Sequence, residues 1–248
     1  MKRHYRVMGI TCAALVTSQV EASGFRLPEA SIAGLGMGNA LVANALELGA
    51  LPYNPAAMSF HEGTHVMGGL LFVDHILQAT PTGGAGSVGG DNGSVAIIPN
   101  FFVTGQIVPQ WSWGLNVNAP FGLSTNWPAN TFPTLSAPAT RPAHPAQSKI
   151  EMVNINPNVS YKFNARISAA FGVDYYYIKK VKLDTQAVTI SGDGDEFGWN
   201  AAVLHVHGPW SFGASYRSAV NVPIEGLVNT TAATTELDVP ADSGISTV

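Results

Sequence analysis

The chain has 248 residues, and only 11% of them are charged, whereas about 25% is usual in soluble domains. It contains 26 glycines, and its formal net charge is -4 with 12 lysines and arginines in total. A nucleic-acid partner is excluded, because binding phosphates requires a basic surface that this composition does not supply. Few charges and many glycines favour a membrane barrel, although a secreted soluble all-β protein can share both totals.

Residues 1–22 have the pattern of a signal peptide. An apolar stretch from 7 to 16 follows a basic start, and Ala22 is a small residue at the expected cleavage position. The basic residues are Lys2, Arg3 and Arg6. The stretch is shorter than the about 20 residues of a membrane-spanning helix. We therefore expect cleavage before Ser23 rather than an uncleaved anchor.

The single cysteine, Cys12, lies inside this signal peptide. The mature chain then has no thiol, which excludes disulfides, cysteine-bound metals and a cysteine nucleophile. No second run of 18 or more apolar residues follows the signal. A helical membrane protein is therefore excluded, and a membrane location requires a closed barrel.

Residues 23–60 differ from everything that follows them. The stretch from 31 to 51 mixes glycine, alanine, leucine and asparagine without period-two alternation, and Pro52 and Pro55 punctuate its end. We interpret 23–60 as a compact segment that precedes a barrel. Since wide barrels are either open or filled, this segment is a candidate plug.

From residue 61 onward, apolar and polar residues alternate with period two. Successive side chains of a strand point to opposite faces, so this pattern predicts strands with one face toward lipid and the other toward a lumen. The clearest case is 152–166, where Ile155 and Val159 share the apolar parity while Asn154 and Asn156 share the polar one. The seven candidate strands are 64–78, 93–108, 111–121, 150–164, 166–182, 196–208 and 210–224.

A β-sandwich with one buried face also predicts such alternation. Here the second face is neutral and polar, and it lacks the lysines and glutamates of a soluble surface. Aromatic residues gather at the strand ends, as in interfacial girdles. These observations favour an all-β fold, a transmembrane antiparallel β-barrel. A proline-rich stretch from 123 to 148 is expected to be an exposed connection.

Three motifs suggest sites that we do not expect to exist. Residues 84–89 fit a dinucleotide fingerprint, but no helix is expected to follow, so we interpret them as a hairpin loop. Asp193 and Asp195 lack the other ligands of a calcium loop. His205 and His207 lack a third metal ligand. No nucleophile elbow is present. We therefore expect no metal, no cofactor and no catalytic site, with an outer-membrane esterase or protease as the enzyme alternative.

Several stretches match one family in their order and spacing over nearly the whole mature chain. They are 23–27, 34–36, 54–56, 119–127, 153–157, 197–201 and 215–218. In these stretches the chain resembles the FadL/TodX outer-membrane transporters of long-chain fatty acids and hydrocarbons. The resemblance implies a fourteen-stranded barrel closed by an N-terminal hatch. Seven strands are about half of such a barrel, so we expect residues 61–248 to be its N-terminal portion and the chain to be truncated.

The resemblance also implies roles for individual residues. The substrate-binding residues would be Gly24, Phe25, Arg26 and Leu27 at the mature start, Leu123, Trp127 and Phe132 in an external apolar groove, and Lys179 for the carboxylate. Asn54, Pro55 and Ala56 would close the hatch. Lys179 lies on the apolar parity of its strand. A bulge would turn it into the lumen, and snorkelling at the interface is the alternative.

Together these interpretations predict a protein of the bacterial outer membrane that takes up hydrophobic compounds passively. Its expected partners are a hydrophobic small-molecule ligand and outer-membrane lipid, and we expect it to be a monomer. The alternative is a structural or adhesive outer-membrane barrel without a specific ligand.

Overall fold

The structure is a computed structural model that describes residues 27–80, 87–90, 95–122, 124–127, 145–185, 187–230, 233–240, 242 and 245–247. Five residues with predicted roles lie outside these ranges: Gly24, Phe25, Arg26, Leu123 and Phe132. The signal peptide and residues 84–86 of the glycine-rich motif also lie outside them. Among the described residues, no helix has the length and the apolar character needed to cross a membrane.

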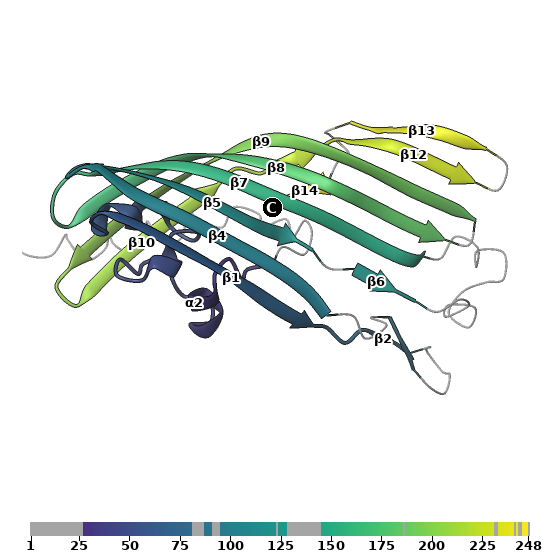
Figure 1. The fold of residues 1–248 in the computed structure, drawn as a ribbon, viewed down its shortest axis with the longest axis horizontal. Helices are drawn as coiled ribbons and strands as arrows, with labels where there is room; N and C mark the ends of the chain where they lie inside the picture. The colour runs from purple at the N-terminus through teal and green to yellow at the C-terminus, as the bar shows by residue number, and fades with distance from the viewer. Residues whose placement is uncertain are drawn as a thin grey trace, which may run out of the picture.

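The main element is a curved antiparallel sheet of ten strands (Figure 1). Its strand order is β1-β4-β5-β7-β8-β9-β12-β13, while β10 also pairs with β9 and β6 pairs with β7. The strands of this sheet are β1 Thr64–Asp74, β4 Val95–Val108, β5 Trp111–Phe121, β6 Ser124–Asn126, β7 Pro145–Lys162, β8 Ile167–Thr185, β9 Val188–His207, β10 Trp210–Arg217, β12 Ile224–Thr230 and β13 Thr234–Val239.

Two small sheets complete the β structure. One pairs β2 (Gln78–Ala79) with β3 (Val88–Gly89), and the other pairs β11 (Asn221–Val222) with β14 (Ile245–Ser246). The first pairs β2, which precedes the glycine-rich motif 84–89, with the last two residues of that motif in an antiparallel ladder, as in a hairpin. The next described residues after Gly90 belong to the strand β4.

The two ends of the main sheet differ in how their strands are connected (Figure 1). At one end, β4, β7 and β9 reach the next strand through turns of two to four residues, at 109–110, 163–166 and 208–209. In the turn after β7, Asn164 Oδ1 accepts hydrogen bonds from the backbone N–H groups of Arg166 and Ile167, at 2.8 and 3.1 Å, as asparagine side chains do in tight turns. The opposite end holds the long connections from β1 to β4 and from β5 to β7, and also the short connections at 186–187 and 231–233.

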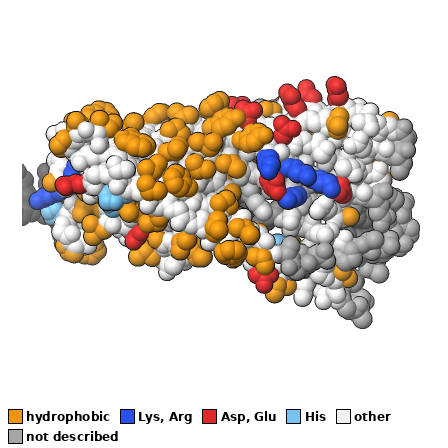
Figure 2. Space-filling view, viewed as in Figure 1, with side chains coloured by type: hydrophobic (Ala, Val, Ile, Leu, Met, Phe, Trp, Pro, Cys, Tyr) orange, Lys and Arg blue, Asp and Glu red, His pale blue; other side chains and the backbone are white. Residues whose placement is uncertain are grey.

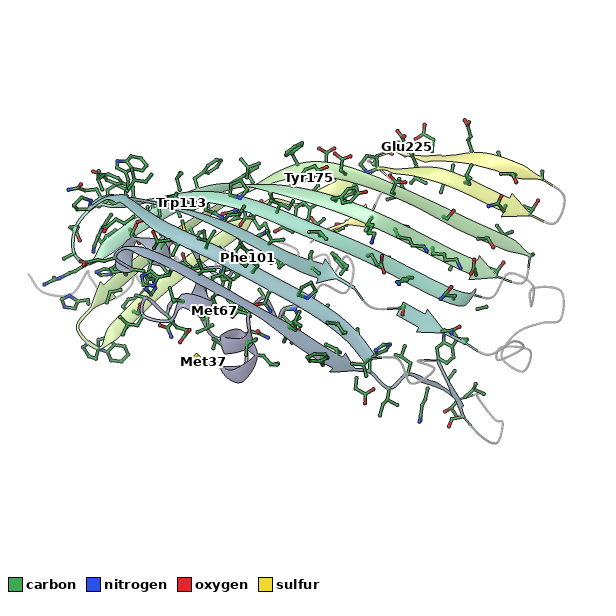
Figure 3. The ribbon with its side chains drawn as sticks, in the orientation of Figure 1. Met37, Met67, Phe101, Trp113, Tyr175 and Glu225 are labelled. Atoms are coloured by element: carbon green, nitrogen blue, oxygen red, sulfur yellow. The ribbon has the colours of Figure 1, made fainter. Side chains whose placement is uncertain are left out.

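Alternation of burial along the strands confirms the predicted two faces. In β8, Ser168, Ala170 and Asp174 are buried, whereas Phe171 and Val173 are exposed. The buried parity faces the N-terminal helices, and the exposed parity forms a continuous apolar band (Figure 2). Phe101, Trp113 and Tyr175 belong to this outward set (Figure 3).

The strand predictions are confirmed for most of the sheet, with several differences. β7 begins at Pro145 rather than at 150, and β6 spans Ser124–Asn126, so parts of the stretch 123–148 that was expected to be a connection are strands. β9 begins at Val188 rather than at 196, because backbone pairing with β8 and β12 extends the strand through the glycine- and aspartate-rich stretch around Gly192 and Gly194. The predicted strand 210–224 is interrupted, since β10 ends at Arg217 and β12 begins at Ile224. The β12–β13 hairpin was not predicted.

Candidate functional site

The N-terminal segment, residues 27–60, forms three short helices, α2 (Ile32–Gly36), η1 (Leu48–Ala50) and η2 (Pro55–Phe60). Asn54 begins η2: its Oδ1 accepts the backbone N–H of Ala56 at 3.0 Å, and Pro55 occupies the first helical position, where proline is favoured. Ser31 caps α2 in the same way, with Oγ accepting the N–H of Gly34 at 2.9 Å.

Direct hydrogen bonds join this segment to the inner face of the sheet. Asn54 Nδ2 donates to the carbonyl oxygens of Val42 at 2.7 Å and Val203 at 3.0 Å, so one side chain links the segment to β9. Ser168 Oγ on β8 donates to the Ala56 carbonyl at 2.7 Å. The hydroxyls of the buried pair Ser59 and Ser160 lie 2.9 Å apart.

Apolar contacts fill the same interface. Met58 of η2 packs in one buried cluster with Phe102 of β4 and Leu204 of β9. Two glycines of the sheet permit the close approach. A Cβ at Gly213 would lie 2.1 Å from the Val42 carbonyl oxygen, and one at Gly114 would lie 2.3 Å from the Met58 sulfur. The N-terminal segment is therefore closely packed against the inner face of the sheet.

A cavity of about 440 Å³ lies between the N-terminal segment and the strands β4, β5 and β10. Its lining includes the apolar side chains of Leu27 and Ile98. It also includes polar groups, from Tyr53, Asn100, Asn118 and Arg217. Such a volume is in the range of small-molecule sites, which combine an apolar lining with a few placed polar groups.

Arg217 brings a guanidinium to the cavity, whose lining also includes Glu29. A buried network holds the guanidinium in place. Its Nη1 is paired with Asp174 and also donates to Asn154 Oδ1 at 3.2 Å. Asp174 is fully buried, and it accepts further hydrogen bonds from Asn154 Nδ2 at 3.0 Å and Asn200 Nδ2 at 3.1 Å. A buried carboxylate requires such pairing because desolvation penalises an unpaired charge.

Several buried amide atoms of the inner face have no hydrogen-bond partner within the described protein. They include Asn100 Nδ2 and Asn118 Oδ1, which belong to residues that line the cavity, and Asn116 Nδ2 and Oδ1 beneath η2. Buried polar groups are normally satisfied by protein, water or ligand. The cavity therefore presents donors and acceptors as well as apolar surface.

Tyr53 lines the cavity and forms hydrogen bonds to residues near the start of the N-terminal segment. Its hydroxyl accepts the N–H of Ala30 at 3.1 Å and donates to Asn39 Oδ1 at 2.7 Å. Burial raises the pKa of Tyr53, because the phenolate is poorly solvated there. At the other end of the segment, burial lowers the pKa of His61, and the neighbouring His65 lowers it further.

The structure places the described members of the predicted site in different regions. Leu27 is buried, lines the cavity, and donates its N–H to the Pro120 carbonyl at 2.9 Å. Trp127 lies near Gly90 and donates its N–H to Ala146 O at 2.7 Å, away from the cavity. Lys179 is exposed, where β8 has a bulge against both neighbouring strands.

Sequence reasoning gave no role to Arg217 or Asp174. A signal was present, since Arg217 shares the polar parity of its strand with Ser211, Gly213 and Ser215, and it is the charged member of that set. Asp174 likewise interrupts a run of small residues on the inner parity of β8. Among the described residues, no three histidine, aspartate or glutamate side chains are grouped so as to hold a metal.

Comparisons with known proteins agree over most of the chain. The model of a family described as outer membrane protein transport protein (OMPP1/FadL/TodX) matches residues 13–246. Proteins named long-chain fatty acid transport protein, from Escherichia coli O6:H1 strain CFT073 and from Salmonella typhi, are each 23% identical to it. Both matches cover 86% of this chain but 54% of the relative, so the chain spans about half the length of these proteins.

Solved structures have a similar fold. A Pseudomonas aeruginosa FadL homologue has a TM-score of 0.56 at 18% identity, covering 86% of this chain and 56% of the other. A monoaromatic hydrocarbon channel, the TodX ΔS2S3 mutant, has a TM-score of 0.58 at 15% identity, covering 77% and 57%. At these identities the likeness indicates a common fold.

Proposed function

We propose, from the premise that the chain belongs to the outer membrane protein transport protein family (OMPP1/FadL/TodX), that it contributes to the passive uptake of hydrophobic compounds, with long-chain fatty acids as the main substrate class. The chain is a protein of the bacterial outer membrane. The observation that carries the proposal is the cavity beside Leu27, which combines apolar surface with the guanidinium of Arg217.

The chemistry of the cavity suits a carboxylate attached to an apolar chain. An arginine guanidinium binds carboxylates through paired N–H donors. Leu27 and Ile98 supply apolar surface close by, and burying a hydrocarbon chain contributes about 25 cal/mol per Å². In this proposal Arg217 orients the head group, while the apolar lining and the N-terminal residues Gly24 to Leu27 contact the tail.

The orientation follows from the connections between strands. In transmembrane barrels, short turns face the periplasm and longer loops face the exterior. The turns at 109–110, 163–166 and 208–209 then mark the periplasmic end. Trp127 follows β6 at the exterior end of this orientation, and we propose that it belongs to an apolar groove with Leu123 and Phe132. In our proposal this groove captures the ligand before it reaches the cavity.

We propose that residues 23–60 act as the hatch and that residues 61–248 form the N-terminal portion of the barrel. The two-sided hydrogen bonding of Asn54 supports a hatch that is docked by a small number of directional bonds. Movement of Asn54, Pro55 and Ala56 away from β8 and β9 would open a path for the ligand along the inner face of the sheet. No energy source is required, since the ligand moves down its own gradient.

The test is binding of oleate and oleyl alcohol, which share a tail and differ in the head group, to the purified protein. Replacing Arg217 alone leaves Asp174 buried without its partner, so the variant is the double substitution Arg217→Gln with Asp174→Asn. Arg217→Lys, which keeps the charge, is the matched control. We expect the double variant to weaken oleate binding about tenfold and to leave oleyl alcohol binding unchanged.

Circular dichroism on each variant separates this effect from a loss of folding. If oleate binding is saturable and is the same in wild type, in the double variant and in Arg217→Lys, Arg217 is rejected as the head-group residue. No saturable binding of either compound would reject the transport proposal and favour a structural or adhesive barrel.

A further inference from the structure

Four lysines gather on the outward face of the sheet, at the edge of the apolar band (Figure 2). They are Lys149 of β7 and Lys179, Lys180 and Lys182 of β8. The whole chain has 12 lysines and arginines, so a third of its basic side chains belong to this cluster. This concentration is independent of the cavity and of the proposed transport.

Strand register brings these lysines together. Lys149 is paired with Lys182, and Glu151 with Lys180. Like charges directly opposite each other on a sheet are destabilising, so the arrangement needs counter-charges. Glu151 Oε1 lies 2.5 Å from Lys149 Nζ, and Asp184 Oδ2 lies 2.5 Å from Lys182 Nζ. Two lysines are thus held in place by carboxylates of their own strands.

The remaining two lysines sit at the β-bulge of β8. The register with β7 moves from Ile178 opposite Met152 to Lys180 opposite Glu151, so Lys179 is the inserted residue. Bulges change the direction in which side chains point, and Lys179 and Lys180 are both exposed. Within the cluster, the four lysines face two carboxylates of the same strands, Glu151 and Asp184, which leaves an excess of positive charge.

Acidic residues bound the cluster on one side. Asp193 of β9 lies beside the bulge, and Asp195 and Glu225 continue the acidic strip toward β12. All three side chains are exposed, and Glu225 points outward (Figure 3). The positive charge is therefore confined to β7 and β8 and does not spread over the whole edge.

The position along the strands corresponds to the level of lipid head groups. Outward residues just before the cluster on β8 are Val173, Tyr175 and Tyr177, and tyrosines are enriched where the apolar core meets the head groups. The cluster lies at the end of β7 and β8 opposite the turn at 163–166, which is the exterior end in the orientation proposed above. Lysines at this depth extend their apolar stems along the band and place the ammonium groups among the head groups.

We propose that Lys149, Lys179, Lys180 and Lys182 form a binding site for the phosphate of an anionic membrane lipid in the leaflet that surrounds the exterior half of the barrel. Lys149 and Lys182 flank the site, while Lys179 and Lys180 contact the phosphate directly. The lipid tails lie along the apolar band below. Attraction between anionic lipid and a lysine near the surface corresponds to about a fivefold gain in affinity for each lysine.

The test is a titration of the purified full chain, in neutral detergent, with bisphosphorylated lipid A and with phosphatidylcholine, monitored by native mass spectrometry. The variant is Lys179→Gln with Lys180→Gln, and the matched control removes two charges at the periplasmic end, Lys162→Gln with Arg166→Gln. Lys179→Arg with Lys180→Arg keeps the charge. Circular dichroism verifies that all variants are folded.

We expect wild type to prefer lipid A to phosphatidylcholine, and the Gln variant at the bulge to lose about 25-fold in lipid A affinity. The periplasmic control and the Arg variant should bind as wild type does. Equal binding of both lipids by wild type, or an equal loss in the periplasmic control, would overturn the proposal. Full competition by inorganic phosphate at the lipid concentration would overturn the assignment to a membrane lipid.

Discussion

Asn54 and Val203 are 149 residues apart in the chain, and the Asn54 side-chain amide donates to the Val203 carbonyl at 3.0 Å. The same side chain accepts the Ala56 N–H and donates to Val42 O. One asparagine therefore begins η2, closes the loop before it and attaches both to β9. These three roles can be separated by substitution.

Asn54→Asp keeps the oxygen that caps η2 but removes the donor to Val42 and Val203. We expect it to destabilise the attachment of residues 42–60 by about 1–2 kcal/mol, while Asn54→Ala also loses the cap and about 1 kcal/mol more. Amide hydrogen exchange of this region measures both effects. Equal exchange in the Asp variant and wild type would show that the bonds to the carbonyls contribute nothing.

Gly213 allows the backbone at Val42 to approach β10, and a Cβ there would lie 2.1 Å from the Val42 carbonyl oxygen. Gly213→Val should therefore displace the N-terminal segment locally and increase proteolysis near residues 42–46. Gly122→Ala is the matched control, because a Cβ at that position meets no atom within 4 Å. If Gly213→Val is cleaved near residues 42–46 no faster than wild type, this contact is contradicted.

The buried pair of Asp174 and Arg217 predicts an asymmetric effect of substitution. Asp174→Ala leaves the guanidinium without its carboxylate and should cost about 3–5 kcal/mol of unfolding free energy. Removing both charges, by Asp174→Asn with Arg217→Gln, should cost less than the single change. Urea unfolding in detergent micelles measures the unfolding free energy of each variant. A larger loss of unfolding free energy in the double variant than in Asp174→Ala would refute the prediction.

The outward parity of β8 predicts a depth-dependent response to charge. Val173→Lys places an ammonium on the lipid face within the band and should cost about 2–4 kcal/mol, whereas Ile167→Lys, near the turn, should cost about 0–1 kcal/mol. Unfolding from lipid vesicles measures both. Similar costs at the two positions would indicate that the outward face does not meet lipid.

Tyr53 predicts an alkaline dependence of the N-terminal segment. Because burial raises its pKa above the usual 10.0, the neutral phenol stabilises the folded segment below that value, and this contribution is lost as the pH rises through the raised pKa. Hydrogen exchange at residues 28–39 should therefore accelerate at alkaline pH in wild type. In Tyr53→Phe the same residues should exchange faster at neutral pH, without the additional alkaline step.

Much of the main sheet could be predicted from the local pattern of apolar and polar residues. Period-two alternation around Asn154 and Asn156 identified β7 and its two faces, because neighbouring residues of a strand point in opposite directions whatever their partners are. The beginning of β9 was missed because the sequence around Gly192 and Gly194 does not alternate between apolar and polar residues. The extended conformation of this stretch depends on its pairing with β8 and β12.

By itself, the sequence determined most of the strands and their two faces, since these depend on near neighbours along the chain. Only the tertiary structure decided that Arg217 pairs with Asp174, that Asn54 reaches Val203, and that Lys179 lies at a bulge. Such contacts depend on strand register, and a shift of one residue in pairing moves every side chain to the other face. Register is set by long-range pairing, which the pattern of a single strand does not encode.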